Sequence, residues 1–336
     1  MAEHLQRAKS FICGVAGTVL TAAERAFLTA EQPYGVILFA RNIESPAQVR
    51  ALVTEIRSLL THAFAEILID QEGGRVARLR PPHWRAYPPA LALAARGDAA
   101  RAVYVNARLI AEELRGLGIS TDCAPLADVL APECHAIIGD RAFGSDARVV
   151  AELGRAQAEG LLDGGVLPVL KHIPGHGRAT LDSHEALPIV TAPLAELEAS
   201  DFVPFRSLAD LPLAMTAHIL YTALDAERVA TLSPIVIRFI REEIGFDGLL
   251  MSDDLSMKAL GGSYASRAEM TLAAGCDLVL HCNGNMAEMQ DVARASRWLE
   301  GDALRRATRA AACRRAPNPA AEAALLAEWQ DMLAVA

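Results

Sequence analysis

The stretch DGLLMSD, residues 247–253, is a short apolar run that begins at a glycine turn and ends in a carboxylate. Short apolar runs with such boundaries are typical of strands buried on both faces of a parallel sheet. The chain contains eight of them: ICGVAG (12–17), YGVILFA (34–40), AEILID (65–70), ISTDCAP (119–125), VLPVLKH (166–172), PLAMTAH (212–218), DGLLMSD (247–253) and CDLVLHC (276–282). A helix-like stretch follows each run, so the sequence predicts an α/β fold, the TIM (β/α)8 barrel.

The chain shows no sign of a boundary between domains. No Gly/Ser-rich or Pro-rich linker divides it and no fixed-period repeat is present, so we expect residues 1–336 to form a single barrel domain. Ser45 and Ser233, each followed by proline, are predicted helix N-caps, and the tail from about 302 to 336 is predicted to be helical. The alternative is an open doubly wound sheet, but no GxGxxG or GxxxxGK[ST] turn supports its nucleotide-binding forms.

The composition narrows the possible partners. The 336 residues carry a formal charge of −9 without any Lys/Arg-rich run, so nucleic acid is not an expected partner. Six cysteines occur without CxxC pairs or the spacing of a zinc site, which indicates buried, reduced thiols. We therefore expect neither a metal nor another cofactor.

The N-terminal region has an alternative interpretation. The apolar run FICGVAGTVLTAA (11–23) follows two basic residues and could be a secretory signal. Two glycines interrupt the run, and Glu24 and Arg25 follow in a helix-like pattern, which argues against a signal. Elsewhere the chain lacks the ~18 uninterrupted apolar residues that a membrane span needs. A cytoplasmic protein without a membrane partner is the expectation.

Polar side chains end six of the eight predicted strands. These residues are Asp70, Asp128, Lys171 with His172, His218, Asp253, and His281 with Asn283. A cap or a turn would explain any one of them, but six on one rim are hard to explain as caps. In a barrel of this type the catalytic groups lie at the C-terminal ends of the strands. The sequence therefore predicts an active site at that rim.

Asp253 is the most informative of these residues. It closes a largely apolar strand, where its carboxylate has little freedom to move, and it is a candidate nucleophile or general base. The alternative is that Asp253 or Asp254 only N-caps a following helix, DLSMKAL. Both roles are compatible, since one carboxylate can cap while the other faces the pocket.

The segment KHIPGHGRATLDSHEALP, residues 171–188, supplies a complementary group. Gly175 and Gly177 let the segment turn freely and Pro174 and Pro188 bound it, so residues 178–186 are predicted to form a mobile flap over the strand ends. Asp182 and His184 lie two positions apart, so the carboxylate can orient the imidazole, which exchanges protons near neutral pH. The sequence thus predicts an acid/base pair, although an exposed turn would also explain a DSH triplet.

Four motifs in this order resemble a known family. LIDQEGGRVARL (68–79), IIGDRAF (137–143), KHIPGHG (171–177) with DSH (182–184), and FDGLLMSDDLSM (246–257) are similar to the signature segments of family 3 glycoside hydrolases. The closest resemblance is to the single-domain bacterial β-N-acetylglucosaminidases, or β-hexosaminidases, of peptidoglycan recycling. It extends from about Gly14 to Asn283.

The resemblance implies roles for individual residues. It makes Asp253 the nucleophile, with Asp254 a structural neighbour, and makes His184 the acid/base, oriented by Asp182, in place of the usual second carboxyl. The residues that it assigns to the N-acetylglucosamine ring are Asp70, Arg78, Arg141, Lys171 and His172. His176 is expected to hold the PGHG turn. Ile173 replaces the family's usual phenylalanine without expected consequence, and no role is assigned to the HCNGN strand end.

The implied reaction is hydrolysis with retention of configuration, through a covalent glycosyl-enzyme intermediate. The implied substrate is a muropeptide, N-acetylglucosaminyl-1,6-anhydro-N-acetylmuramic acid with or without its stem peptide. The second domain that supplies the acid in family members acting on larger glucosides is not expected in this chain. Whether phosphate can replace water, how much stem peptide is tolerated and the oligomeric state stay open, with a monomer as the simplest expectation.

Two other functions are possible on the sequence alone. His172, His176, His184, His218 and Asp253 could surround a zinc ion, but no HxH or HExxH motif supports metal-assisted hydrolysis. A non-catalytic sugar-binding protein would be expected to have lost the catalytic groups, whereas Asp182, His184 and Asp253 are all present. Both alternatives are less well supported than the glycosidase.

Overall fold

Eight parallel strands close into a barrel in this computed structural model, which describes residues 7–62, 65–132, 136–179, 181, 187–317 and 322–334. The barrel strands are β1 (Lys9–Cys13), β2 (Pro33–Leu38), β3 (Glu66–Ile69), β6 (Thr121–Asp122), β7 (Leu167–Ile173), β9 (Leu213–Thr216), β11 (Leu249–Asp254) and β12 (Leu278–His281). Their order around the barrel is β1-β12-β11-β9-β7-β6-β3-β2. Each predicted apolar run supplies one strand, so the predicted TIM barrel is confirmed.

The first strand lies earlier in the chain than the apolar run suggested, because Gly14 already leaves it. The Gly14 N–H donates to the His281 carbonyl at 2.8 Å, at the junction of the first and last strands. A Cβ on Gly14 would lie 2.2 Å from the Cys282 carbonyl oxygen, so only glycine permits this approach. The rest of the run leads into helix α2 (Ala22–Glu31), which Thr21 and Glu24 start with a capping box.

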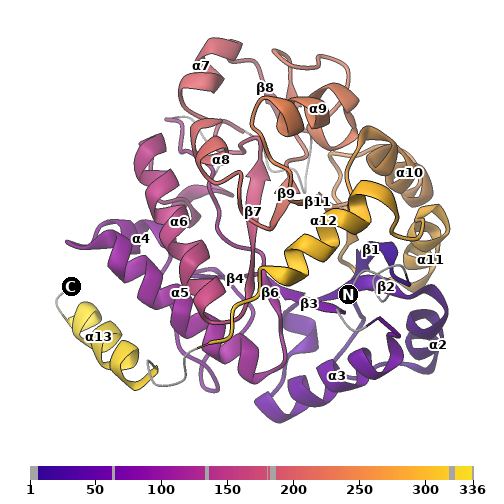
Figure 1. Cartoon of the computed structure of the whole chain (residues 1–336), viewed down its shortest axis with the longest axis horizontal. Coiled ribbons are helices and arrows are strands. Elements are labelled where there is room, and N and C mark those ends of the chain that lie inside the picture. The colour runs from indigo at the N-terminus through magenta and orange to yellow at the C-terminus, as the bar shows by residue number, and fades with distance from the viewer. Residues whose placement is uncertain are drawn as a thin grey trace.

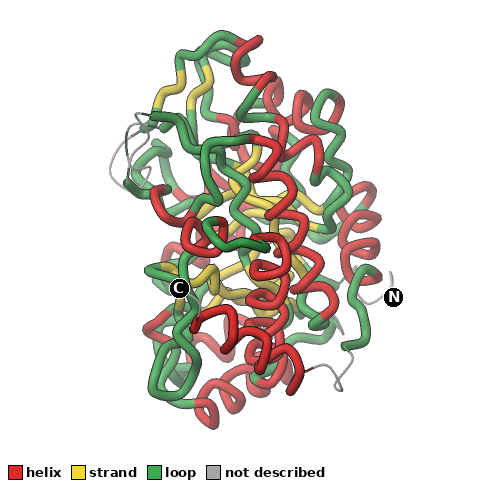
Figure 2. The backbone as a smooth tube through the Cα atoms, turned by 90° about the vertical axis from the view of Figure 1, so that its left-hand side faces the viewer, coloured by secondary structure: helices red, strands yellow, loops and turns green. Residues whose placement is uncertain are grey.

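Helices and loops surround the strands (Figure 2). The remaining longer helices are α3 (Pro46–Leu59), α5 (Ala99–Gly116), α6 (Ala147–Asp163), α9 (Pro234–Glu242), α10 (Tyr264–Ala274), α11 (Met286–Ala295), α12 (Gly301–Ala312) and α13 (Glu322–Ala334). Ser45 and Ser233 cap α3 and α9 as predicted, with proline at the first helical turn of each. Within the described residues, no helix has both the length and the apolar character that crossing a membrane requires.

Short elements complete the chain and form much of the rim. They are the short helices α4 (Ala90–Ala94), α7 (Leu194–Ala199) and α8 (Val203–Ser207), the 3-10 turns η1 (Ala40–Asn42), η2 (Gly139–Arg141) and η3 (Ala230–Leu232), and the strand pairs β4 (Gln71–Gly73) with β5 (Val76–Ala77) and β8 (Ile189–Val190) with β10 (Leu220–Tyr221). Strands β4 and β5 pair in the antiparallel sense, as a hairpin that follows β3 directly.

Alternate residues of each strand belong to different layers of the core. Leu68, Met251 and Leu280 share a buried cluster with alanines of α12. The neighbours of these residues, such as Ile67 and Val279, lie in a cluster with residues of the surrounding helices. Side chains on a strand point to opposite faces in turn, so the first set fills the barrel and the second packs on the helices. Burial on both faces explains why the strand sequences are almost continuously apolar.

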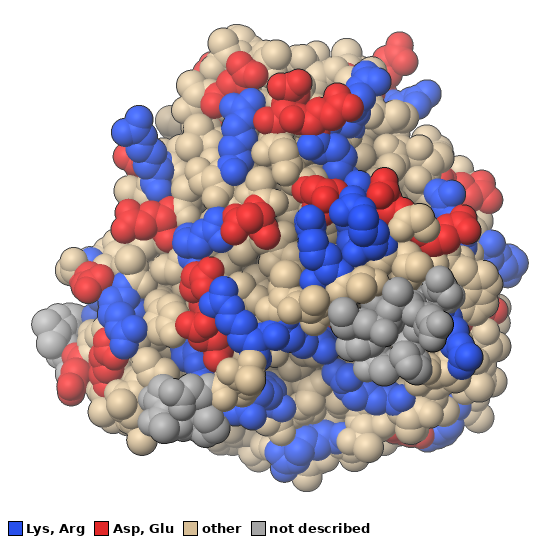
Figure 3. Space-filling model, viewed as in Figure 1, with Lys and Arg blue, Asp and Glu red and all other residues tan. Residues whose placement is uncertain are grey.

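Helix α12 covers the end of the barrel where the strands begin. It lies across the near end of the barrel in Figure 1, and Arg306 pairs with Asp277, the residue before β12. Arg314, just beyond α12, pairs with Glu66, the first residue of β3, whose side chain is fully buried. Basic and acidic side chains lie next to one another over much of this face (Figure 3). In the C-terminal tail, α12 and α13 are helical and residues 314–317 are not. Helix α13 packs on α5, where Trp329 donates to Asn106.

Candidate active site

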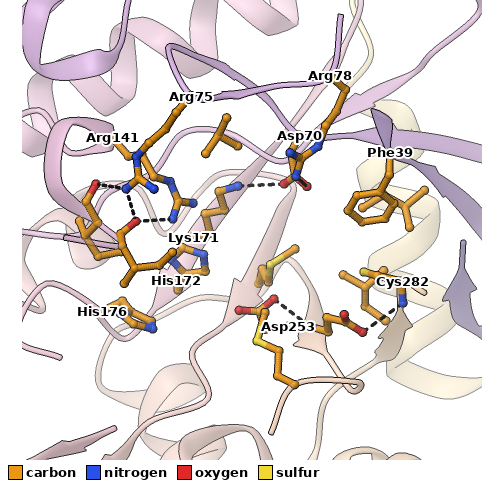
Figure 4. Close-up of a pocket in the computed structure, with 18 residues that line it drawn as sticks. Phe39, Asp70, Arg75, Arg78, Arg141, Lys171, His172, His176, Asp253 and Cys282 are labelled. Atoms are coloured by element: carbon orange, nitrogen blue, oxygen red, sulfur yellow. Dashed lines mark hydrogen bonds and ion pairs between the residues drawn. The ribbon is translucent and has the colours of Figure 1, made fainter. Parts of the chain in front are cut away.

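A pocket of about 180 Å³ opens at the other end of the barrel, where the strands end. Six of the eight predicted site residues line it: Asp70, Arg78, Arg141, Lys171, His172 and Asp253. Figure 4 shows these side chains around a single cavity, with Lys171 pointing toward Asp70. The two remaining predicted residues, Asp182 and His184, lie outside the described residues.

The two-residue period of the strands explains why these side chains reach the pocket. Four lining residues each follow an inward-facing core residue by two positions: Asp70 after Leu68, Lys171 after Val169, Asp253 after Met251 and Cys282 after Leu280. The inner face of each of these four strands is therefore apolar inside the barrel and ends in a pocket-lining side chain at its mouth.

Asp253 lies at the end of β11 with only 7% of its surface exposed. Its Oδ1 accepts the N–H of Asp254 at 2.7 Å. Burial acts to raise the pKa of this carboxyl, but the adjacent rings of His172 and His218, together with that hydrogen bond, outweigh it and lower the pKa below its ordinary value of 3.8. The group is therefore ionised at neutral pH, as a nucleophile must be.

Asp254 has a structural role, but not as the cap of the helix that the sequence suggested. Its Oδ1 accepts N–H groups from Ser256 at 2.9 Å and from Cys282 at 3.0 Å, so it ties the end of β11 to β12. Residues 255–260 form turns instead of a helix. The next helix, α10, starts after Ser263, whose side chain accepts the N–H of Ser266. The alternative in which Asp253 or Asp254 caps a helix over DLSMKAL is wrong, because no helix forms over residues 254–260 and Asp254 bonds to the neighbouring strand instead.

Five charged side chains of alternating sign form one wall of the pocket, and we call them the ion-pair chain: Arg78, Asp70, Lys171, Glu72 and Arg141. Arg78 Nη2 donates to Asp70 Oδ2 at 2.9 Å, and Lys171 Nζ donates to Asp70 Oδ1 at 3.1 Å. Lys171 also pairs with Glu72, which in turn holds Arg141. Burial tends to raise the pKa of Asp70, but the charges of Lys171 and Arg78 lower it overall, so Asp70 is ionised.

His172 and His176 are anchored to one buried carboxylate, Asp128. Asp128 Oδ2 lies 2.7 Å from His172 Nδ1, and Oδ1 accepts the backbone N–H of His176 at 2.6 Å. Burial raises the pKa of Asp128, but the two rings and these hydrogen bonds lower it overall. The contact to Nδ1 leaves His172 Nε2 for the pocket. The backbone N–H of His176 thus ties the turn to Asp128, while its ring lines the pocket, which the sequence did not indicate.

Gly177 restricts the PGHG turn instead of loosening it. A Cβ at this position would lie 1.8 Å from the Val129 carbonyl oxygen, so the turn is packed tightly on the segment after Asp128. The Gly177 carbonyl accepts the N–H of Ala131 at 3.1 Å, which fixes the same contact. The freedom that the sequence suggested for this glycine is therefore not present in the described part of the segment.

Comparison with known proteins places this arrangement in a family. Residues 13–312 match the model of the glycosyl hydrolase family 3 N-terminal domain. The chain belongs to glycosyl hydrolase family 3. The match spans all of the ion-pair chain, Asp128 and Asp253, which agrees with the resemblance seen in the sequence motifs.

Relatives of this family 3 chain indicate which type of glycoside hydrolase it is. A β-hexosaminidase of Methylococcus capsulatus is 43% identical over 273 residues, which are 80% of each chain. One from Pseudomonas aeruginosa is 40% identical over 277 residues, 82% of each chain. The crystal structure of NagZ from Neisseria gonorrhoeae in complex with N-trifluoroacetyl-D-glucosamine superposes with a TM-score of 0.85 at 30% identity, over 98% of this chain and 97% of that one. The chain is thus a glycoside hydrolase of the β-N-acetylhexosaminidase type.

Two of the strand-end histidines lie behind the pocket of this family 3 enzyme. His218 is fully buried, with Nδ1 2.7 Å from Thr231 Oγ1 and Nε2 3.0 Å from the Asp254 carbonyl oxygen. His281 is also buried and stacks edge-on against Tyr264. Neither ring lines the pocket, and among the described residues no group of three or more His, Cys, Asp or Glu is arranged to hold a metal ion.

Asp122 is a buried carboxyl at the end of β6 that the sequence did not single out. It is 0% exposed, its Oδ1 accepts the Gln71 N–H at 2.9 Å, and its Oδ2 has no hydrogen-bond partner among the described residues. Burial raises its pKa to about 7, although the Gln71 N–H and Lys171 oppose the shift. Between pH 4 and 7 the folded protein therefore holds a proton here that the unfolded chain has lost, so stability falls as pH rises.

Replacing Asp122 with asparagine should consequently stabilise the protein in a pH-dependent way. The difference between the ordinary pKa of 3.8 and the folded-state pKa of about 7 corresponds to a stabilisation of up to about 4 kcal/mol. This stabilisation should be fully present above pH 7 and absent below pH 4. Urea unfolding of Asp122→Asn and wild type at pH 4.5 and pH 8 measures the difference at each pH. An unchanged difference between the two conditions would contradict this assignment.

Proposed function

We propose that this family 3 enzyme is a retaining β-N-acetylglucosaminidase that removes one terminal N-acetylglucosamine at a time. The observation that carries the proposal is an ionised, buried Asp253 that lines a small pocket together with four members of the ion-pair chain, Arg78, Asp70, Lys171 and Arg141. The pocket volume of about 180 Å³ lies below the roughly 300–1,000 Å³ of sites for drug-sized ligands, as expected for a single sugar ring. Paired charges suit a ring that presents adjacent hydroxyls.

In the proposed mechanism Asp253 attacks the anomeric carbon. A carboxylate–sugar bond forms while the glycosidic bond breaks, and His184, oriented by Asp182, gives its proton to the departing oxygen. A water molecule then gives a proton back to His184, attacks the same carbon and releases Asp253. Two displacements leave the anomeric configuration as it was. The histidine step is inferred from the sequence alone.

We further propose that the substrate is a 1,6-anhydro-muropeptide ending in N-acetylglucosamine, cleaved in the cytoplasm during peptidoglycan recycling. The resemblance of the motifs supports this assignment, as does the likeness to NagZ from N. gonorrhoeae, which was crystallised with an N-acylated glucosamine. Arg75 and Arg78 line the pocket and would offset the repulsion between an anionic aglycone and a protein of net charge −9. Residues 1–336 are proposed to act as one catalytic domain and as a monomer.

One assay tests the proposed function directly. The purified protein is incubated with N-acetylglucosaminyl-1,6-anhydro-N-acetylmuramic acid, with and without phosphate, and the products are followed by NMR. We expect free N-acetylglucosamine, released first as the β-anomer, in both conditions. Release of the α-anomer would contradict a retaining mechanism, release of the sugar 1-phosphate would show a phosphorylase, and an uncleaved disaccharide would refute the proposed substrate.

Recognition of the ring predicts a large effect at Asp70. Asp70→Ala removes the carboxylate shared by Arg78 and Lys171, so transition-state binding should weaken by about 2–3 kcal/mol. The matched control is Asp140→Ala on the rim, where an exposed pair with Arg75 contributes little. Measured kcat/KM on a nitrophenyl N-acetylglucosaminide should fall about 30-fold or more in the first variant only. Equal values for both variants would place the sugar elsewhere.

A further inference from the structure

Glu72 is buried in the wall of the pocket, is 7% exposed and does not line the cavity itself. It bridges two cationic side chains that do line the cavity, Arg141 and Lys171. Arg141 donates to it from two nitrogens, Nε to Oε2 and Nη2 to Oε1, at 2.8 Å each. Lys171 Nζ lies 2.6 Å from Oε1. Two parallel hydrogen bonds give a planar guanidinium a single orientation, whereas the ammonium of a flexible lysine takes the position that its partners impose.

The hairpin that carries Glu72 is rigid. The Gln71 side chain accepts the backbone N–H groups of Arg78 and Leu79 at 2.8 and 3.0 Å and donates to the Leu79 carbonyl at 3.0 Å. Gly73 has φ of 103°, and a Cβ there would lie 2.4 Å from the Pro88 carbonyl oxygen. A carboxylate on this hairpin has a defined position, so it can set the positions of side chains from other elements.

The two cations depend on Glu72 to different degrees. Lys171 is 2% exposed and keeps a second carboxylate, Asp70, at 3.1 Å. Arg141 belongs to the turn η2 and, apart from Glu72, donates only to the Ile137 carbonyl, at 3.0 Å, among the described contacts. Loss of Glu72 would therefore free the guanidinium to turn and would pull the ammonium toward Asp70.

We propose that Glu72 is a positioning residue, which fixes the Arg141 guanidinium and the Lys171 ammonium in the orientation that binds the sugar ring in the transition state. The inference rests on the proposed function, because it takes a sugar as the ligand of these cations. It assigns a role to a carboxylate that never touches the substrate.

Glu72→Gln tests the proposal with little change of shape. The amide keeps one acceptor but places an NH2 group against the cations, so kcat/KM should fall by about 10²-fold, the effect typical of a misplaced binding group. Glu72→Asp keeps the charge and shortens the reach, so it should lose activity to a similar degree while unfolding near the wild-type temperature. The matched control is Glu112→Gln, because Glu112 is also buried between two arginines but lies in α5, away from this pocket.

A double-mutant cycle separates positioning from general stability. If Glu72 acts through Arg141, then the double variant Glu72→Gln/Arg141→Met should have a kcat/KM only slightly below that of Arg141→Met alone. Additive losses, or loss of activity in Glu112→Gln equal to that in Glu72→Gln, would overturn the proposal. Values of kcat/KM within threefold of wild type for both Glu72→Gln and Glu72→Asp would also overturn it.

Failure of the proposed function gives a different result. If wild type cleaves another β-glycoside and not the N-acetylglucosaminide, the proposed function is wrong, and the same variants are compared on the glycoside that is cleaved. If wild type cleaves neither, calorimetric binding of a transition-state analogue of N-acetylglucosamine, its planar 1,5-lactone oxime, to wild type and Glu72→Gln replaces the rates. A weakening of about 10²-fold supports the positioning role, and equal affinities refute it.

Discussion

Asp253→Asn should lower turnover of an N-acetylglucosaminide by about 10⁴-fold or more, the usual consequence of removing a nucleophile. The amide has nearly the same shape as the carboxylate but cannot form the ester to the anomeric carbon. The Asp254 N–H that now donates to Asp253 Oδ1 can donate equally to an amide oxygen, so the strand end should be kept. Circular dichroism and thermal unfolding of the variant check that the loss is chemical.

Trapping the intermediate identifies the nucleophile independently. A 5-fluoro-N-acetylglucosaminyl fluoride should form a long-lived ester with the wild-type enzyme, and mass spectrometry of its peptides should find the label on Asp253. Asp254 is the alternative site, since it also lines the pocket. A label on Asp254 would show that the two carboxylates have the opposite roles, and normal turnover by Asp253→Asn would exclude the covalent mechanism at this residue.

His184→Ala should slow the enzyme by an amount that depends on the leaving group. A sugar or alkyl alkoxide cannot depart without a proton, so cleavage of the disaccharide should fall by about 10²–10⁴-fold, the contribution of a general acid. A nitrophenolate departs without this help, so formation of the glycosyl-enzyme from a nitrophenyl glycoside should be much less affected. Rates on both substrates, with rapid-quench measurement of the intermediate, provide the test.

The second half of the reaction gives a further sign of the same role. Without its base, the variant should accumulate the glycosyl-enzyme, and added azide, which needs no deprotonation, should restore part of the turnover. Asp182→Asn should show the same pattern more weakly, because it disturbs the ring without removing it. Equal losses on both kinds of leaving group, with no intermediate, would mean that the acid/base is another residue.

The barrel fold and the position of the site at its rim follow from the local sequence pattern. Apolar runs that end in polar residues predict the barrel and its functional rim, because the two-residue period of a strand carries the inward face from Leu68 to Asp70 and from Met251 to Asp253. The motifs then assign the ring-binding side chains, and the structure brings these to one pocket. The acid/base pair of the DSH triplet stays a prediction from the sequence.

The partners of these side chains were decided by tertiary structure alone. Glu72 meets Arg141 from 69 positions away, and Asp128 meets His172 from 44. The local sequence pattern cannot predict such pairs, because their interaction energy depends on the distance between the two side chains and on their burial, which only the folded structure determines. For the same reason two polar strand ends that look alike in the sequence lie in different places in the structure. Asp253 lines the pocket, whereas His218 is buried behind it.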